Sequence, residues 1–245
     1  MTANATLDLL LRHRSIRSYT DDVVPDAHVR AAVEAGQAAS TSSAVQAYSL
    51  LQITEPEVRA ALVPLTGGQE KVAAAGAFFV VCGDVRRHRL ICEAAGTQYD
   101  ARLEAFLVAA VDASLFAQNL VVAFESMGYG ACYIGGLRND LAAVDALLEL
   151  PDGVYPLYGL CVGVPAEQPL PRPRLAPEAV WFKDRYPDDE VIRELLSSYD
   201  ATYAEYMEAR MGKARAWTPS MARKFATPAR TSVGPYYRDK GAELE

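Results

Sequence analysis

The sequence predicts an α+β protein in which helices pack on a central sheet. Two segments rich in β-branched and aromatic residues, 77–84 and 155–165, are expected to be buried strands. Several other segments carry apolar residues at three- and four-residue steps, which is the helical period. Because the expected helices and strands do not alternate strictly, a layered α+β arrangement is favoured over a doubly wound parallel sheet.

Local patterns place the remaining elements along the chain. In the first half we expect helices at about 6–12, 25–39 and 56–64, with strands at 48–54 and 77–84. In the second half we expect helices at about 103–127, 141–148 and 188–211, a strand-like segment near 131–134 and the strand 155–165. Pro25 and Pro56 stand where proline suits a helix start, and Gly128 where glycine ends a helix. Residues 217–225 and the last twenty residues are expected to be amphipathic and then extended.

The expected helix at 103–127 is unusually apolar. It has the length of a membrane-spanning helix, but Asp112, Gln118 and Asn119 interrupt it. We therefore expect a helix that is buried on nearly all sides in a soluble protein. Such a helix needs packing partners all around it, and a second subunit is one way to supply them.

The composition excludes some broad classes of protein. The chain has 245 residues, of which 51% are hydrophobic and 22% charged, as in ordinary soluble globular proteins. Its formal net charge is −7, which argues against general binding to nucleic acids or to anionic membranes. The N-terminal apolar stretch 7–11 is too short for a signal peptide and runs directly into Arg12.

The cysteines and histidines do not predict a metal site. None of the four cysteines forms a C-x-x-C pair, and the chain has three histidines. Cys82 and Cys161 lie within apolar runs, so we expect them to be small core residues. Free thiols fit the reducing environment of the cytoplasm.

Positive charge is concentrated in three segments. Segment 12–17 contains three arginines, His13 and Ser15, and guanidinium groups beside a hydroxyl suit a phosphate. Two further basic groups follow: Arg172 and Arg174 in a proline-rich loop, and Arg210, Lys213 and Arg215 near a helix end. Taken one by one, the three segments fit solvated patches, or cations that complement a helix dipole, better than a phosphate site.

Three loops are rich in hydroxyl groups or in glycine. They contain Ser40, Thr41, Ser42 and Gln46; Gly67, Gly68 and Gln69; and Tyr133, Ile134, Gly135 and Gly136. Paired glycines allow a backbone to approach a flat ring closely, and a glutamine amide can both donate and accept hydrogen bonds. Each loop alone is also consistent with an ordinary turn or helix cap.

Familiar catalytic motifs are missing from the sequence. It contains no H-E-x-x-H, no G-x-S-x-G, no G-x-G-x-x-G and no phosphate-binding P-loop. Separated cationic and hydroxyl-rich loops around an apolar frame instead indicate a phosphorylated cofactor that performs the chemistry itself.

These segments together resemble the nitroreductase family, in particular its larger NADPH-preferring branch. The resemblance is carried by HRSIRSYTDD, AASTSSAVQAYSLLQIT, LTGGQEKVA, VDASLFAQNLVVAFESMGYGACYIGGLRND, LYGLCVGVPA, PRPRLAP and the arginine-rich loop before Trp217. It implies a central, mostly antiparallel sheet flanked by helices, in an intertwined homodimer with FMN at the interface. It also implies a single FMN-binding domain over residues 1–245, whose C-terminal extension, about 186–245, wraps the partner subunit.

The resemblance further implies roles for individual residues. The FMN phosphate and ribityl chain would be held by His13, Arg14, Ser15 and Arg17, with help from Arg172 and Arg174. The flavin would be contacted by Ser40, Thr41, Ser42 and Gln46 of the partner subunit, and by Gln69, Tyr133, Ile134, Gly135 and Gly136. Arg210 would read the NADPH phosphate, with Lys213 and Arg215 as alternatives because this loop is about two residues shorter than is usual in the family.

The implied activity is a two-electron, ping-pong transfer of hydride from NADPH to nitroaromatics, quinones or related small acceptors, with no side chain as acid or base. Two alternatives remain open. One is an NADPH-dependent flavin reductase that supplies free reduced FMN, or a dehalogenase-like relative. The other is a non-catalytic flavin-binding module.

Overall fold

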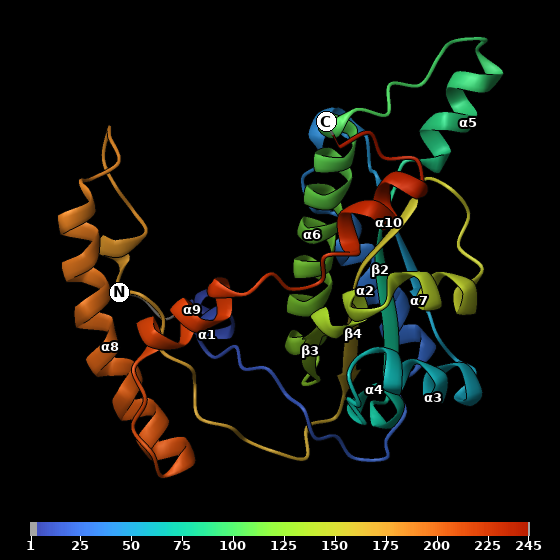
Figure 1. Ribbon diagram of the computed structural model, residues 1–245. Coiled ribbons are helices and arrows are strands. Elements are labelled where there is room, and N and C mark those ends of the chain that lie inside the picture. Colours follow the sequence, from blue (N-terminus) through green and yellow to red (C-terminus); the bar gives the residue numbers. More distant parts are fainter. Residues whose placement is uncertain (1–3, 245) are drawn as a thin grey trace. The chain divides into compact units, whose positions relative to one another are not determined.

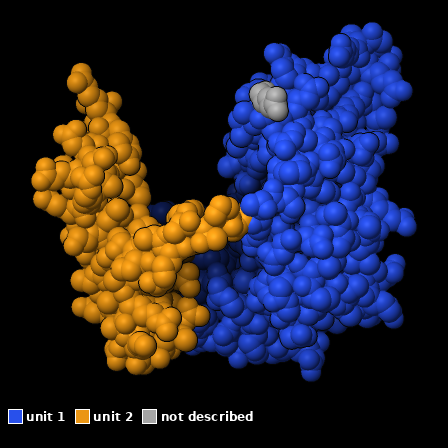
Figure 2. All heavy atoms as spheres, viewed as in Figure 1, with its two compact units in different colours: residues 1–169, 230–245 blue, residues 170–229 orange. Residues whose placement is uncertain are grey.

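The computed structural model describes residues 4–244, which form two compact units (Figures 1 and 2). The first unit contains the described residues up to 169 and those from 230 onward, and the second contains residues 170–229. The end of the chain thus returns to the first unit after the second is complete.

The first unit contains a four-stranded antiparallel sheet with the order β1-β2-β4-β3. Its strands are β1 (Tyr48–Gln52), β2 (Ala77–Asp84), β3 (Gly130–Ile134) and β4 (Val154–Gly163). Every residue of β2, one of the two inner strands, is buried, as its mostly apolar sequence predicts, and this includes Asp84 at its end. The predicted antiparallel sheet and both predicted buried strands are confirmed.

Two hydrophobic clusters lie on opposite faces of this sheet. Because side chains alternate along a strand, Phe79 and Val81 of β2 belong to one cluster, while Phe78 and Val80 belong to the other. The first cluster includes the long helix α6 (Leu103–Ser126), and the second includes α3 (Pro56–Leu65). Cys82 and Cys161 are fully buried in the second cluster, which confirms their expected place in the core.

The first unit contains further helices, not all of which pack on this core (Figure 1). They are α1 (Ala5–Leu11), α2 (Asp26–Gln37), α4 (Lys71–Ala74), α5 (Arg86–Ala94), α7 (Leu141–Leu148) and α10 (Val233–Asp239). Short 3-10 turns occur at η1 (Ser42–Ala44) and η2 (Gly135–Asn139). The prediction that the C-terminal segment is extended is wrong at α10. A helix forms there because Tyr236 and Tyr237 bury their rings, and the centroid of the Tyr237 ring lies 4.9 Å from that of Phe106.

Helix α6 is buried on one face and exposed on the other within the single chain. Phe116, Leu120 and Phe124 are buried, whereas Leu107, Val111 and Leu115 are 47%, 54% and 44% exposed. The expectation of burial on nearly all sides is therefore wrong for one chain. Helix α6 is long and apolar enough to cross a membrane, but core helices of soluble proteins meet the same criteria.

The second unit is built on α8 (Asp189–Met211) and α9 (Trp217–Ala226), with a 3-10 turn η3 (Pro177–Ala179). Helix α8 ends at Gly212, whose φ of 65° is the left-handed conformation that glycine adopts easily. Asp200 of α8 accepts hydrogen bonds of 2.8 Å from the backbone nitrogens of Trp217 and Thr218, and so caps α9.

Candidate functional site

Segment 12–17 lies along the edge strand β3. The backbone nitrogen of Ile16 donates to Ala131 O at 3.0 Å, and Ser15 pairs with Ala131 in an isolated parallel bridge. Ile16 itself is buried, so it anchors the segment by its side chain as well. The cationic residues on both sides of Ile16 are consequently held at the surface of the sheet.

Two glutamates far away in sequence hold this segment in place. His13 Nδ1 lies 2.6 Å from Glu125 Oε1, near the end of α6. Glu167 Oε1 accepts from the backbone nitrogens of Arg17 at 2.5 Å and Ser18 at 3.1 Å. Both carboxylates are thus engaged with the segment. Sequence reasoning missed them, because the partners are separated by more than 100 positions.

A cavity of about 700 Å³ opens beside this segment. It is lined by Leu9, Arg12, His13, Arg14, Ile16, Glu125, Tyr129, Gly130, Pro165, Ala166, Glu167 and Gln168. Of the predicted phosphate ligands, His13 and Arg14 line it. Arg17 is exposed outside the lining, and its Nη1 donates to Ser15 O at 3.2 Å.

The predicted glycine and glutamine loops meet each other. Gln69 Nε2 donates to Thr66 O at 2.8 Å, and the backbone of Gly136 packs directly against both residues. A β-carbon on Gly136 would lie 2.5 Å from Gln69 Nε2 and would clash with Thr66 O. Only glycine allows so close an approach, so η2 and the 66–69 turn form one continuous backbone surface.

A second cavity, of about 340 Å³, lies next to Gly135. Tyr133 and Tyr158 border it with their rings perpendicular and 5.3 Å apart, and burial raises the pKa of both phenols. The phenols are therefore neutral hydrogen-bonding groups at physiological pH. Ile134 is fully buried and contributes only its backbone to this region.

Arg230 is a candidate residue that sequence reasoning missed. Its Nε donates to Asn139 Oδ1 at 3.0 Å, and its guanidinium lies near Gly135. Burial, and then the nearby Arg138 guanidinium, lower the pKa of Arg230. No local sequence pattern indicates this residue. It reaches η2 only because the C-terminal segment returns to the first unit.

The hydroxyl-rich loop 40–46 precedes β1 on the same unit. Ser40, Ser42 and Gln46 are exposed and Thr41 is half-buried, so their side chains are available to a ligand or a partner chain. Gln46 Nε2 makes a long 3.5 Å hydrogen bond to Ala44 O. The loop includes the 3-10 turn η1.

In the second unit, two predicted groups of arginines come together at a tyrosine. Arg210 Nη1 donates to the phenol oxygen of Tyr206 at 2.9 Å. Partial burial would raise the pKa of this phenol, but hydrogen bonds from Arg172 and Arg210 outweigh it and lower the pKa. Arg174, Lys213 and Arg215 are exposed. The convergence of Arg172 and Arg174 with segment 12–17 stays a prediction.

Comparison with known proteins shows which families and relatives the chain is similar to. Residues 10–164 match the model of the Nitroreductase family, and residues 172–245 match that of the Nitroreductase family, C-terminal domain. The FMN reductase (NADPH) of Bacillus subtilis is 40% identical, covering 97% of this chain and 98% of its own. The oxygen-insensitive NADPH nitroreductase of Salmonella typhimurium is 42% identical, covering 96% and 97%.

Solved structures of similar proteins have the same fold. The NfrA1 structure from B. megaterium superposes with a TM-score of 0.95 at 39% identity, covering 97% of this chain and 99% of its own. The NADPH:FMN oxidoreductase from Vibrio harveyi, complexed with NAD+, gives a TM-score of 0.88 at 37% identity and covers 97% and 98%.

Proposed function

Because the chain belongs to the nitroreductase family, we propose that it is an FMN-containing, NADPH-dependent oxidoreductase. Its acceptors are nitroaromatics, quinones or related small molecules. The observation that carries this proposal is the cavity of about 700 Å³ lined by His13 and Arg14. It lies in a chain whose relatives are named FMN reductase (NADPH) and NADPH-flavin oxidoreductase. A non-catalytic module is disfavoured, because these relatives are enzymes.

The residues present fit FMN. His13, Arg14, Ser15 and Arg17 provide the donors that a phosphate monoester needs, and Glu125 and Glu167 hold their segment. Gly136 packs so closely on Thr66 and Gln69 that a β-carbon would clash there, and the backbone surface that results suits the edge of a flat ring. When bound, FMN would accept hydride from NADPH at N5 and pass two electrons to the acceptor. Arg138 and Arg230, close to Gly135, would stabilise negative charge on the reduced ring.

We further propose that NADPH and the acceptor occupy the same place in turn, as a ping-pong cycle requires. The phenols of Tyr133 and Tyr158 stay protonated and would serve only to shape this place. No side chain described near Gly135 is assigned to proton transfer, because water can supply the proton.

The exposed apolar stripe on α6 supports a homodimer. Leu107, Val111 and Leu115 recur at four-residue steps and would be covered by a second copy. In that dimer the segment from about 186 to 229 would wrap the partner, because the residues from 230 onward return to the first unit of their own chain. Loop 40–46 would contact the partner's flavin. The dimer would act in the cytoplasm without nucleic acid or membrane partners.

The dimer gives a first testable prediction. Val111→Lys is expected to shift the protein from dimer to monomer, because it places an ammonium group inside an apolar interface. Sedimentation velocity measures the change. Val23→Lys is the matched control, since Val23 is 76% exposed in a loop and the variant should remain dimeric. A Val111→Lys variant that sediments as a dimer would contradict the proposed interface.

The NADPH preference gives a second prediction. Arg210→Ala is expected to raise the KM for NADPH about tenfold while leaving the KM for NADH nearly unchanged, because only NADPH carries the 2′-phosphate. Arg193→Ala on the same helix is the control, since its side chain is 72% exposed and pairs only with Asp189 among the described residues. If KM rises equally for both nicotinamides, Lys213 or Arg215 becomes the better candidate.

An anaerobic titration of the purified protein with NADPH and NADH tests the proposed function directly. Bleaching of the visible flavin absorbance by about one equivalent of NADPH is expected. The alternative, supply of free reduced FMN, is favoured by relatives named FMN reductase and NADPH-flavin oxidoreductase. Turnover of free FMN compared with nitrofurazone separates the two activities. A protein that takes up no FMN would refute both.

A further inference from the structure

The loop between α2 and β1 has an unusual backbone. Ser43, Ala44 and Gln46 have φ angles of 47°, 59° and 53°, although none of them is glycine. The left-handed region is unfavourable for residues with a β-carbon, by roughly 1 kcal/mol or more each. Three such residues within four positions persist only if the surrounding structure holds the loop firmly.

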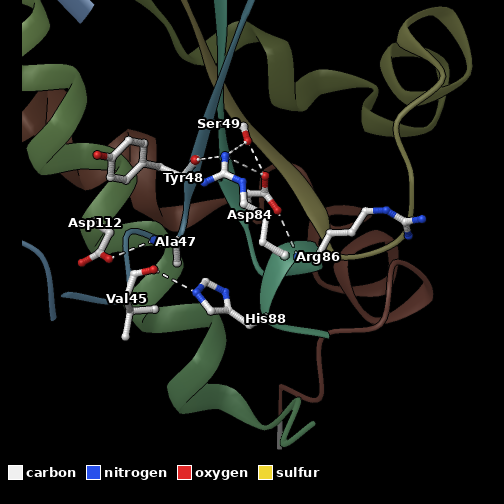
Figure 3. Close-up of polar contacts among 9 residues, drawn as sticks. Val45, Ala47, Tyr48, Ser49, Asp84, Arg86, His88 and Asp112 are labelled. Carbon is white, nitrogen blue, oxygen red and sulfur yellow. Dashed lines mark hydrogen bonds and ion pairs between the residues drawn. The ribbon is translucent and has the colours of Figure 1, made fainter. Parts of the chain in front are cut away.

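A buried carboxylate of α6 binds both ends of this loop. Asp112 is 0% exposed. Its Oδ1 accepts from the backbone nitrogen of Ser42 at 3.0 Å and its Oδ2 from that of Ala47 at 3.1 Å. Figure 3 shows the Asp112 side chain directed at Ala47. A buried carboxylate is tolerated only with such partners, so the loop and Asp112 depend on each other.

A second helix holds the middle of the same loop. His88 Nε2 of α5 lies 2.8 Å from Val45 O, and because a carbonyl only accepts, this nitrogen carries the proton (Figure 3). The carbonyl of Ala47 in turn accepts from Asp84 N at 2.9 Å. Loop 42–47 is therefore fixed by α5, α6 and the end of β2, although Ser42 and Gln46 expose their side chains.

We infer that Asp112, assisted by His88, is a positioning residue for flavin binding, because it keeps loop 42–47 in its left-handed conformation before FMN arrives. The inference rests on the proposed function, in which Ser40, Thr41, Ser42 and Gln46 contact the flavin. A loop that is already ordered loses little conformational entropy when the ligand binds, and this strengthens binding. It also explains why a carboxylate interrupts the apolar sequence of α6.

The test compares two conservative variants of buried aspartates. Asp112→Asn replaces one accepting oxygen by an amide that cannot accept, so one end of the loop is released. We expect the Kd for FMN to rise about tenfold, which corresponds to about 1.4 kcal/mol. The visible circular dichroism of the bound flavin should also change, because the asymmetric surroundings of the ring are altered.

Asp84→Asn is the matched control. Asp84 is 5% exposed and accepts from Ser49 Oγ and from Arg86 N at 3.0 Å, but its carboxylate binds nothing in loop 42–47. This variant should lower Tm to a similar extent yet keep the FMN Kd within about twofold of wild type. If Asp84→Asn weakens FMN binding as much as Asp112→Asn, general destabilisation is the cause and the inference is wrong.

The outcomes separate this inference from the proposed function. Wild-type protein that does not bind FMN would refute the proposed function. Wild-type protein that binds FMN, together with an Asp112→Asn variant of unchanged Kd and dichroism, would refute the inference alone. Should Asp112→Asn fail to fold, His88→Ala decides: a rise in Kd of about threefold supports the inference, and an unchanged Kd overturns it.

Discussion

Arg17→Ala is expected to purify almost without bound FMN. Arg17 is exposed at the end of the cationic segment, where Glu167 holds its backbone and its Nη1 reaches back to Ser15 O. A hydrogen bond to a charged group contributes about 1.5–3 kcal/mol, and a guanidinium makes two such bonds to a phosphate. The loss should therefore weaken FMN binding by a hundredfold or more. Flavin released from the denatured protein, counted per protomer, measures it.

Arg30→Ala is the control for loss of a surface arginine. The Arg30 side chain is 82% exposed on α2 and forms only a 3.8 Å ion pair with Glu34 among the described residues. Such surface pairs contribute little, so this variant should retain its full flavin content and its Tm. An Arg17→Ala variant that purifies fully loaded and active would remove Arg17 from the phosphate site.

Gly136→Ala is expected to disrupt both the folded state and flavin binding. The added β-carbon would lie 2.5 Å from Gln69 Nε2 and would clash with the carbonyl of Thr66. Because that carbonyl belongs to the backbone, the 66–69 turn must move away as a whole. Overpacking of this kind costs about 1–3 kcal/mol, which lowers Tm by several degrees. Thermal unfolding of the flavin-free protein and the FMN Kd measure the two effects separately.

The neighbouring glycine provides a sharp comparison. A β-carbon on Gly135 would meet nothing closer than Arg138 Nη2 at 3.5 Å, which is an ordinary contact. Gly135→Ala should therefore keep the Tm of wild type. Any loss of FMN affinity would then come from contact between the added methyl group and the flavin, and not from altered packing of the protein. If Gly136→Ala has the same Tm and the same FMN Kd as Gly135→Ala, the close packing of η2 on the 66–69 turn has no energetic consequence.

The sequence alone determined most of the elements of the first unit. Burial and periodicity are local properties, so the apolar strand 77–84, the helix ended by Gly128 and the helix at 141–148 were readable from patterns. Other elements were not readable. Helix α5 is not indicated by any local pattern. Helix α10 forms where an extended segment is expected, because Tyr237 meets the rings of Phe106 and Tyr155 only in the folded chain.

The candidate site was only half visible in the sequence. Its cationic, hydroxyl and glycine segments stand out as groups of neighbouring residues, whereas their supporting partners do not. Glu125 on His13, Glu167 on Arg17 and Asp112 on loop 42–47 join residues that are 65 or more positions apart. A hydrogen bond depends on where two side chains meet in space, and only the packing of α6 and the sheet edge decided which distant carboxylates arrive there.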